Sequence, residues 1–260
     1  MSPFETAPSE VARPATILLL EGDAEAQWLA DAEAIIPAVL PDVELQMVRA
    51  WATRPDQLDP AAEGPPAALR RRGLIADLDP RVLLQQGHRL VIFSLLPAVA
   101  LPALRHRDGG IFLPHRGLAA GWPPDAAAQL AAECSREAPM PADEAAAALE
   151  PIVEGLLAAG TAVAVCTAFR HVDEPLQYRA GIDPPALRER IRRCNLEVAR
   201  LSRRTGCFVL DLDRPLAQEG GGALQADCHG GAGRAAEIAL DEFAALLLDA
   251  LPIEDFHASA

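Results

Sequence analysis

The chain has 260 residues, half of them hydrophobic, which is enough to bury the core of one large α/β domain. It contains no lysine, so all 23 basic side chains are arginine, and 37 carboxylates give a formal net charge of −14. This charge argues against a nucleic-acid-binding protein or a basic membrane-surface protein, because both present a cationic face, but it is compatible with a local arginine pocket for an anionic ligand.

The N-terminal part predicts a strand, a tight turn and a helix. Residues 1–13 are expected to be a disordered leader before an apolar strand over 16–20. Glu21-Gly22-Asp23 then forms a turn, and residues 25–39 show the apolar spacing of a helix that covers one face of a sheet. Alternation of apolar and polar residues over 43–50 predicts an edge strand.

The middle of the chain is less regular. Residues 53–72 are expected to be irregular before a short helix, and residues 89–94 form a continuous apolar strand of the kind that is buried on both faces. Residues 105–141 mix Gly, Pro, His and Arg, and predict a loop-rich insertion with one or two short helices over the carboxyl edge of the sheet. Such a loop can carry function or be a solvated insertion, and the sequence leaves both open.

The C-terminal half alternates strands with helices. We expect a helix over 142–159, a buried strand over 161–167, and a helix that begins at Pro184-Pro185 and ends at Gly206. A last strand over 207–212, a Gly-rich loop, a final helix over 233–251 and a tail over 253–260 follow. The order predicts one α/β domain over 14–252: a three-layer α/β/α sandwich around a doubly wound, mostly parallel, five-stranded sheet.

The cysteines indicate the compartment. An odd number of cysteines without any C-x-x-C pair is typical of reduced thiols rather than of a disulfide framework or a zinc site. No secretory signal is visible, and the longest apolar run, 90–104, is too short and too interrupted by proline to span a bilayer. We therefore expect a cytoplasmic protein with no membrane span, no metal and no cofactor.

The turn after the first strand is the expected position of the functional site. Gly22 permits a sharp turn, and the first backbone N–H groups of the following helix point at any group above the strand end. The residue after Asp23 is Ala24, which offers no nucleophile.

Four local matches resemble the SGNH, or GDSL-like, hydrolase superfamily, whose flavodoxin-like sheet fits the predicted order. They are Leu20-Glu21-Gly22-Asp23-Ala24, Val91-Ile92-Phe93-Ser94, the set Arg188, Ile191, Asn195 and Ala199 followed by Gly206 to Asp211, and Asp227-Cys228-His229 before the final helix. The resemblance extends over about residues 15–250 and implies a site formed by Asp23, Ser94 and His229.

The diagnostic residues of that superfamily are altered here. The resemblance implies a nucleophilic serine at the position of Ala24, and Ser94 stands where a Gly-x-Asn block would begin. The Asp-x-x-His pair that supplies acid and base is shortened to Asp227-x-His229, and counting back from Gly233 places Cys228 at the histidine position.

A second, local resemblance concerns the same turn. A capsule-polysaccharide acetyltransferase family has Gly-Asn-Cys-Gln followed by a helix, and residues 21–29 look like a relative in which Asn-Cys-Gln is replaced. Ile111-Phe112-Leu113-Pro114 provides a weaker match. This likeness adds acyl transfer, accessory to polysaccharide biosynthesis, to the functions considered, and again places Ala24 at the reactive position.

Three functional interpretations remain open because an acyl-enzyme needs an activated nucleophile beside a base. His229 with Asp227 could activate a water or a sugar hydroxyl directly, giving an ester hydrolase or acyltransferase without a covalent step. Alternatively, Cys228 or Ser94 could be the nucleophile. In the third interpretation the protein is catalytically inactive and binds a glycan or a partner protein.

Several of these residues also have plain structural interpretations. Asp23 could cap the following helix, His229 could be a surface histidine, and Cys228, the one thiol in a predicted loop, could be unreactive. Gly22, Ala24, Ser94, His115 and Arg116 are the expected substrate-binding residues. His106 and Arg107 could complete an anion-binding rim with His115 and Arg116, or all four could simply be solvated.

Overall fold

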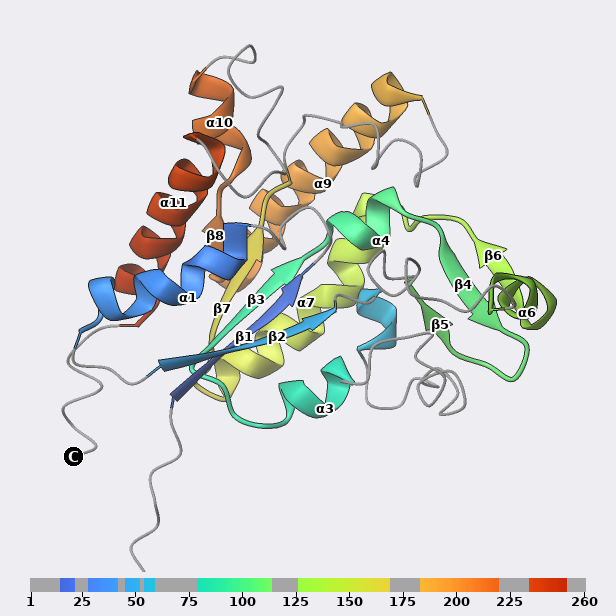
Figure 1. Cartoon of the computed structure of the whole chain (residues 1–260), viewed down its shortest axis with the longest axis horizontal. Helices are drawn as coiled ribbons and strands as arrows, with labels where there is room; N and C mark the ends of the chain where they lie inside the picture. The colour runs from blue at the N-terminus through green and yellow to red at the C-terminus, as the bar shows by residue number, and fades with distance from the viewer. Residues whose placement is uncertain are drawn as a thin grey trace, which may run out of the picture.

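The core of the molecule is a parallel sheet of five strands in the order β2-β1-β3-β7-β8 (Figure 1). Its strands are β1 (Ala15–Glu21), β2 (Leu45–Trp51), β3 (Leu90–Ser94), β7 (Ala162–Cys166) and β8 (Phe208–Leu210). The computed structural model describes residues 15–21, 28–41, 45–51, 54–58, 79–113, 126–168, 183–219 and 234–251. The order confirms the predicted doubly wound sheet, with β2 at an edge.

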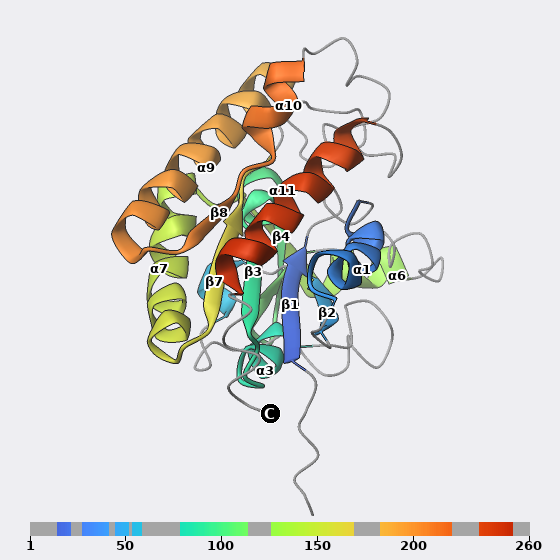
Figure 2. The ribbon, with the colours of Figure 1, turned by 90° about the vertical axis from the view of Figure 1, so that its left-hand side faces the viewer.

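Helices cover both faces of this sheet, as Figure 2 shows. One face packs against α1 (Trp28–Val39) and α11 (Arg234–Ala250). The other face packs against α7 (Ala142–Ala158) and α9 (Pro184–Thr205), together with the short helices α3 (Pro80–Leu84) and α4 (Leu96–Ala100). The predicted three-layer α/β/α sandwich is therefore confirmed.

Strand periodicity explains why the central strands are apolar along their whole length. In β1, Ile17 and Leu19 join the core on the α1 and α11 side, whereas Leu18 and Leu20 join the core on the α7 and α9 side. Successive side chains of a strand point to opposite faces, so a strand covered on both sides needs an apolar residue at every position. All five residues of β3 are buried for the same reason.

The two ends of the described chain lie side by side. α1 packs against α11, and Ile36 of α1 shares one core with Ile238 and Phe243 of α11. Figure 2 shows both helices on the same side of the sheet. The helix that follows the first turn and the helix that follows the predicted catalytic loop therefore belong to one layer.

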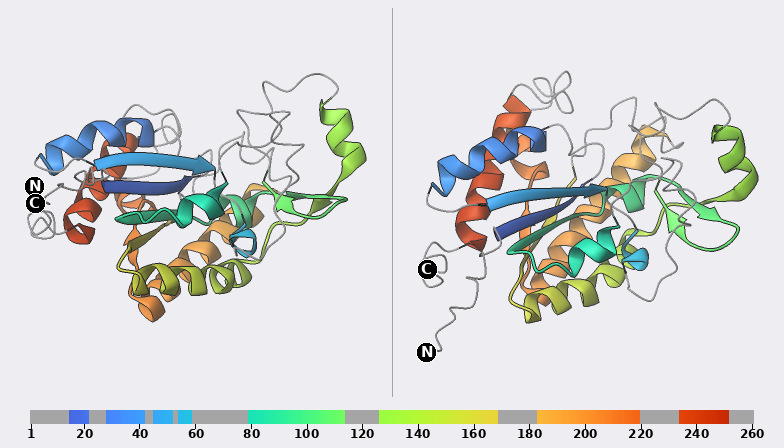
Figure 3. Two further views of the ribbon diagram at one scale, coloured as in Figure 1. Left: turned by 90° about the horizontal axis from the view of Figure 1, so that it is seen from below. Right: turned by 60° about the horizontal axis from the view of Figure 1, so that its bottom comes forward.

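A second, antiparallel sheet occupies the region predicted to be a loop with one or two short helices. Its order is β5-β4-β6, formed by β4 (Ala103–His106), β5 (Ile111–Phe112) and β6 (Cys134–Glu137), with α6 (Ala126–Glu133) before β6. We call these four elements the arm, which projects beside the main sheet (Figure 3). The helix was predicted and the sheet was not, because strands of two to four residues are too short to show a period.

The helices α4 and α10 were not predicted from the sequence, whereas the bounds of α9 were predicted closely. α4 follows β3 within a continuous apolar run, and α10 (Asp213–Glu219) follows β8 directly; η1 (Pro55–Gln57) is a single 3-10 turn. α9 ends as predicted at Gly206, whose φ of 81° is left-handed and suits glycine. In the described part of the chain, no helix is long and apolar enough to cross a membrane.

We predict that truncating Phe243 strongly destabilises the protein. This side chain is fully buried between α11, α1 and the sheet, so Phe243→Ala should reduce the free energy of unfolding by about 3–5 kcal/mol. Leu248→Ala is the matched control, because Leu248 lies on the same helix and is 53% exposed; it should cost less than about 0.5 kcal/mol. Urea denaturation measures both, and equal losses would contradict this packing.

Candidate functional site at the carboxyl edge of the sheet

The ends of β1 and β3 lie next to each other at the carboxyl edge of the sheet. Their register pairs Leu20 with Phe93, so the next residues, Glu21 and Ser94, complete the two strands side by side. From β1 the chain continues to β2 on one side, whereas β3 connects to β7 on the other. In open α/β sheets this reversal of direction leaves a crevice outside the strand ends, where ligands bind.

Ser94 is the one predicted site residue whose position is described. It ends β3 and is 7% exposed. The other predicted residues lie outside the described residues: Gly22, Asp23, Ala24, His115, Arg116, Asp227, Cys228 and His229. Their roles stay predictions.

A hydrogen-bonded cluster around Thr167 joins the ends of β7 and β8. The Thr167 hydroxyl donates to Oδ1 of Asp211 at 3.0 Å and accepts the backbone N–H groups of Leu212 at 2.8 Å and Asp213 at 3.1 Å. Asp211 Oδ1 also accepts the backbone N–H of Arg214 at 3.2 Å. This cluster therefore fixes the path of the chain from β8 into α10.

Asn195 of α9 binds the backbone of Ala168, the residue that follows Thr167. Its Oδ1 accepts the backbone N–H of Ala168 at 2.8 Å, and its Nδ2 donates to the carbonyl of Ala168 at 2.8 Å. One amide side chain thus satisfies both polar backbone groups of a residue that has left the sheet. We call Thr167, Asn195 and Asp211 the edge cluster.

The sequence alone gave no role to the edge cluster. Asn195 and Asp211 stand in the matched motifs, and Thr167 is a polar residue directly after a buried strand. Those signals mark the carboxyl edge but not the bonds, which join residues 27 to 46 positions apart. The cluster orders the backbone around the candidate site rather than offering a nucleophile or base.

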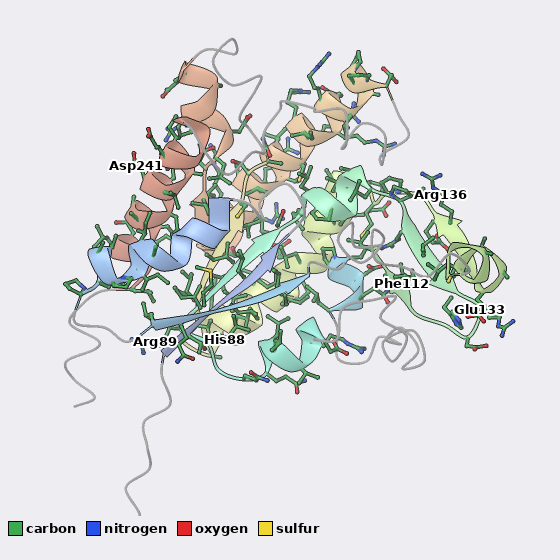
Figure 4. All side chains as sticks on the ribbon, in the orientation of Figure 1. His88, Arg89, Phe112, Glu133, Arg136 and Asp241 are labelled. Atoms are coloured by element: carbon green, nitrogen blue, oxygen red, sulfur yellow. The ribbon has the colours of Figure 1, made fainter. Side chains whose placement is uncertain are left out.

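The structure corrects the predicted anion-binding rim at His106. This side chain is 5% exposed in the arm, where its Nδ1 accepts the backbone N–H of Asp108 at 3.1 Å. Its Nε2 lies 3.4 Å from Glu133 Oε2, on the last residue of α6, which Figure 4 labels on the arm. A histidine so enclosed cannot serve as a solvated cationic rim; Arg107 remains exposed.

His88 has a structural role at the opposite, amino end of the sheet. It is 5% exposed and precedes β3, where Figure 4 labels it beside Arg89. Its Nε2 lies 2.7 Å from the carbonyl of Leu83 and therefore donates, so Nδ1 accepts the Thr16 hydroxyl at 2.7 Å. Both ring nitrogens are used in holding α3 to the start of β1.

The structure describes four cysteines, of which Cys166, Cys194 and Cys207 are buried and Cys134 is partly exposed. Burial raises the pKa of the Cys207 thiol, and burial together with the charge of Glu133 raises the pKa of Cys134. The thiolate is the nucleophilic form, so a raised pKa makes each of these two thiols a weaker nucleophile at neutral pH.

Comparison with known proteins gives structural likeness only. No protein-family model matches the sequence, and no curated protein is significantly similar to it. A catalytic mutant of the acetylxylan esterase Axe2 from Geobacillus stearothermophilus is similar with a TM-score of 0.49 and 11% identity, covering 92% of this chain and 94% of the esterase. A protein from Slackia heliotrinireducens that is proposed to be an SGNH hydrolase has a TM-score of 0.46 and 13% identity over 89% and 98% of the two chains.

A third similar structure is the psychrotrophic esterase EstA from Pseudoalteromonas sp., with a TM-score of 0.41, 15% identity, and coverage of 87% of this chain and 93% of EstA. At these scores the doubly wound fold of this chain rests on its own strand order and register.

We predict that the hydroxyl of Thr167 stabilises the edge. Thr167→Val keeps the shape of the side chain but leaves Asp211 without this donor and two N–H groups without their acceptor, so it should cost about 2–3 kcal/mol. Thr167→Ser, which retains the hydroxyl, should cost about 1 kcal/mol or less for the lost methyl group. Thermal or urea unfolding of both variants measures the difference; equal losses would assign the effect to packing alone.

Alkylation should separate the described thiols from Cys228. With iodoacetamide at pH 7.5, Cys207 should stay unmodified until the protein unfolds, and Cys134 should react slowly and faster as pH rises, because its raised pKa reduces the thiolate fraction. Peptide mass spectrometry assigns each adduct. Rapid modification of Cys134 at neutral pH would contradict the raised pKa, and rapid modification of Cys228 alone would favour it as a nucleophile.

Proposed function

We propose that this chain is an SGNH-hydrolase-like protein that acts on, or binds, an acylated carbohydrate or another ester at the carboxyl edge of its sheet. The observation that carries the proposal is the adjacency of the β1 and β3 ends, where Leu20 pairs with Phe93 one residue before each strand ends. The motif Gly22-Asp23 follows Glu21 directly in the sequence. A site built there has a serine at the end of one strand, and the sequence Gly22-Asp23 directly after the end of the next.

The proposed reaction proceeds without an acyl-enzyme because residue 24 is alanine. His229, oriented by Asp227, would take a proton from water while the water oxygen attacks the ester carbonyl. Backbone N–H groups after Gly22 would stabilise the developing oxyanion. Collapse of this intermediate breaks the bond to the alcohol, which leaves with the proton held by His229, and a carboxylic acid is released.

Acyl transfer differs only in the attacking group. A sugar hydroxyl in place of water would give a new ester, with an acyl ester as the donor. This variant corresponds to an accessory role in polysaccharide biosynthesis, which the resemblance at residues 21–29 supports. The odd number of cysteines and the absence of a C-x-x-C pair support a cytoplasmic location for either activity.

Ser94 is better suited to line the proposed site with a polar group than to act as a nucleophile. It is 7% exposed and sits on a strand whose residues are all buried, so a bulky ester has little access to its hydroxyl. Cys228 is the remaining candidate for a nucleophile supplied from elsewhere. The edge cluster would keep the backbone beside this site rigid in every version of the mechanism.

The second candidate function is a catalytically inactive binding protein for a glycan or a partner protein. Ala24 favours it, because removing the nucleophile from a hydrolase leaves oxyanion donors that supply only part of the rate. In this function the same edge of the sheet binds the ligand but catalyses no reaction.

An ester panel distinguishes the two functions. If the enzyme hypothesis holds, the protein should hydrolyse p-nitrophenyl acetate or acetylated xylo-oligosaccharides, and His229→Ala should lower kcat at least 100-fold, the typical contribution of a general base. Thermal unfolding of that variant checks that it still folds. Absence of turnover on the whole panel, with ligand binding retained in His229→Ala, would instead support the binding protein.

Ala24→Ser tests the location of the site independently. The substitution restores a hydroxyl where the superfamily has its nucleophile, so the variant should form a covalent adduct with a fluorophosphonate probe that the parent does not form. Intact-mass spectrometry detects the adduct, and the double variant with His229→Ala should lose it. An unreactive Ala24→Ser protein that folds normally would argue against the proposed alignment of residues 22–24.

A further inference from the structure

The outer face of α9 carries a concentration of arginine in an otherwise acidic protein. The helix holds seven arginines and two glutamates, whereas the whole chain has a net charge of −14. Its apolar residues Leu187, Ile191 and Val198 are buried against the rest of the molecule, so the charged residues gather on the opposite side. The charge of α9 is therefore positive, whereas the net charge of the whole chain is negative.

This face forms one wall of a cavity of about 600 Å³ between α9, the end of α4 and the start of α7. We call this cavity the arginine groove. Four arginines line it, with two carboxylates, Asp143 and Glu197. The arginines are Arg190, Arg192, Arg193 and Arg200.

The same groove has apolar walls. Val99 and Met140 contribute from the side of α4 and α7, and Leu196 projects from α9 between the arginines, 43% exposed. A large apolar side chain so exposed between charged groups is what a ligand with both an anionic and an apolar part would cover.

The arginines exceed the carboxylates that could neutralise them. Glu189 is shared by Arg192 and Arg193, each at 2.8 Å, and these hydrogen bonds, that of Arg192 first, lower the pKa of Glu189 to about 2. Arg200 pairs with Glu197. Arg190 is half-buried and has no ion pair within the described part of the chain. Its guanidinium is available to a ligand.

We propose that the arginine groove binds a small organic anion that combines a phosphate or several carboxylates with an apolar group. Planar guanidinium groups match phosphate and carboxylate oxygens in bidentate geometry. The volume fits a small molecule, since ligand cavities range from about 300 to 1,000 Å³. The strongly negative charge of the rest of the chain disfavours a long polyanion such as a nucleic acid, which would meet repulsion beyond the groove. The arginine groove shares no lining residue with the proposed ester site, and this proposal does not depend on the proposed function.

The test uses phenyl phosphate and benzene-1,3,5-tricarboxylate as probes, in isothermal titration calorimetry of the full chain at low salt. At least one probe should bind, and the preferred probe identifies the phosphate or the polycarboxylate source. Arg190→Gln together with Arg193→Gln should weaken binding at least tenfold. Arg188→Gln together with Arg203→Gln is the matched control, because it removes the same two charges from the same helix outside the groove and should change affinity less than twofold.

Glu189→Gln gives an opposite expectation. Removing the shared carboxylate frees Arg192 and Arg193 and should strengthen binding several-fold. Failure of both probes to bind the folded parent would overturn the proposal. It would also be overturned if Arg188→Gln together with Arg203→Gln weakened binding as much as the double variant in the groove, because the attraction would then be a general effect of charge. Neither result depends on ester turnover.

Discussion

β1 pairs in parallel with both β2 and β3. The pairing of β1 with β3 joins the N-terminal unit of β1, α1 and β2 to the rest of the main sheet. β1 is flanked by strands and covered on both faces, so its pairing with β2 and β3 and the packing of residues 17–20 depend on neighbours distant in the sequence. The same pairing sets the order of the sheet, places α1 and α11 in one layer, and brings the carboxyl ends of β1 and β3 next to each other. The candidate site exists only while this pairing is intact.

Most of the layered fold could be predicted, since the physics that forms it is local. β3 and β7 are continuous apolar runs, and α9 combines helical spacing with prolines at its start and glycine at its end. The short elements could not be predicted in this way. α4 is too apolar to differ from the strand before it, and the strands of the arm are shorter than one recognisable period.

The sequence predicts where a site would lie, and this prediction follows from the rule that parallel strands end at one edge of a sheet. The structure adds that Ser94 ends β3. The edge cluster could not be foreseen, because each of its bonds joins side chains and backbone groups from separate elements. His106 illustrates the same difficulty: a sequence of alternating histidine and arginine suggested a solvated rim, whereas a cross-strand neighbour and a turn enclose the imidazole.

The base of the arm has a practical consequence for the architecture. The backbone N–H of Met140, just after the arm, donates to the carbonyl of Ala98, just before it, at 2.9 Å. The chain therefore leaves the main sheet and returns to it at nearly the same point. Within the arm, Ala103, Ile111 and Leu113 form a small hydrophobic core of their own. A segment whose two ends meet in this way can be inserted, lost or exchanged between related proteins during evolution, while the parallel sheet beside it stays unchanged.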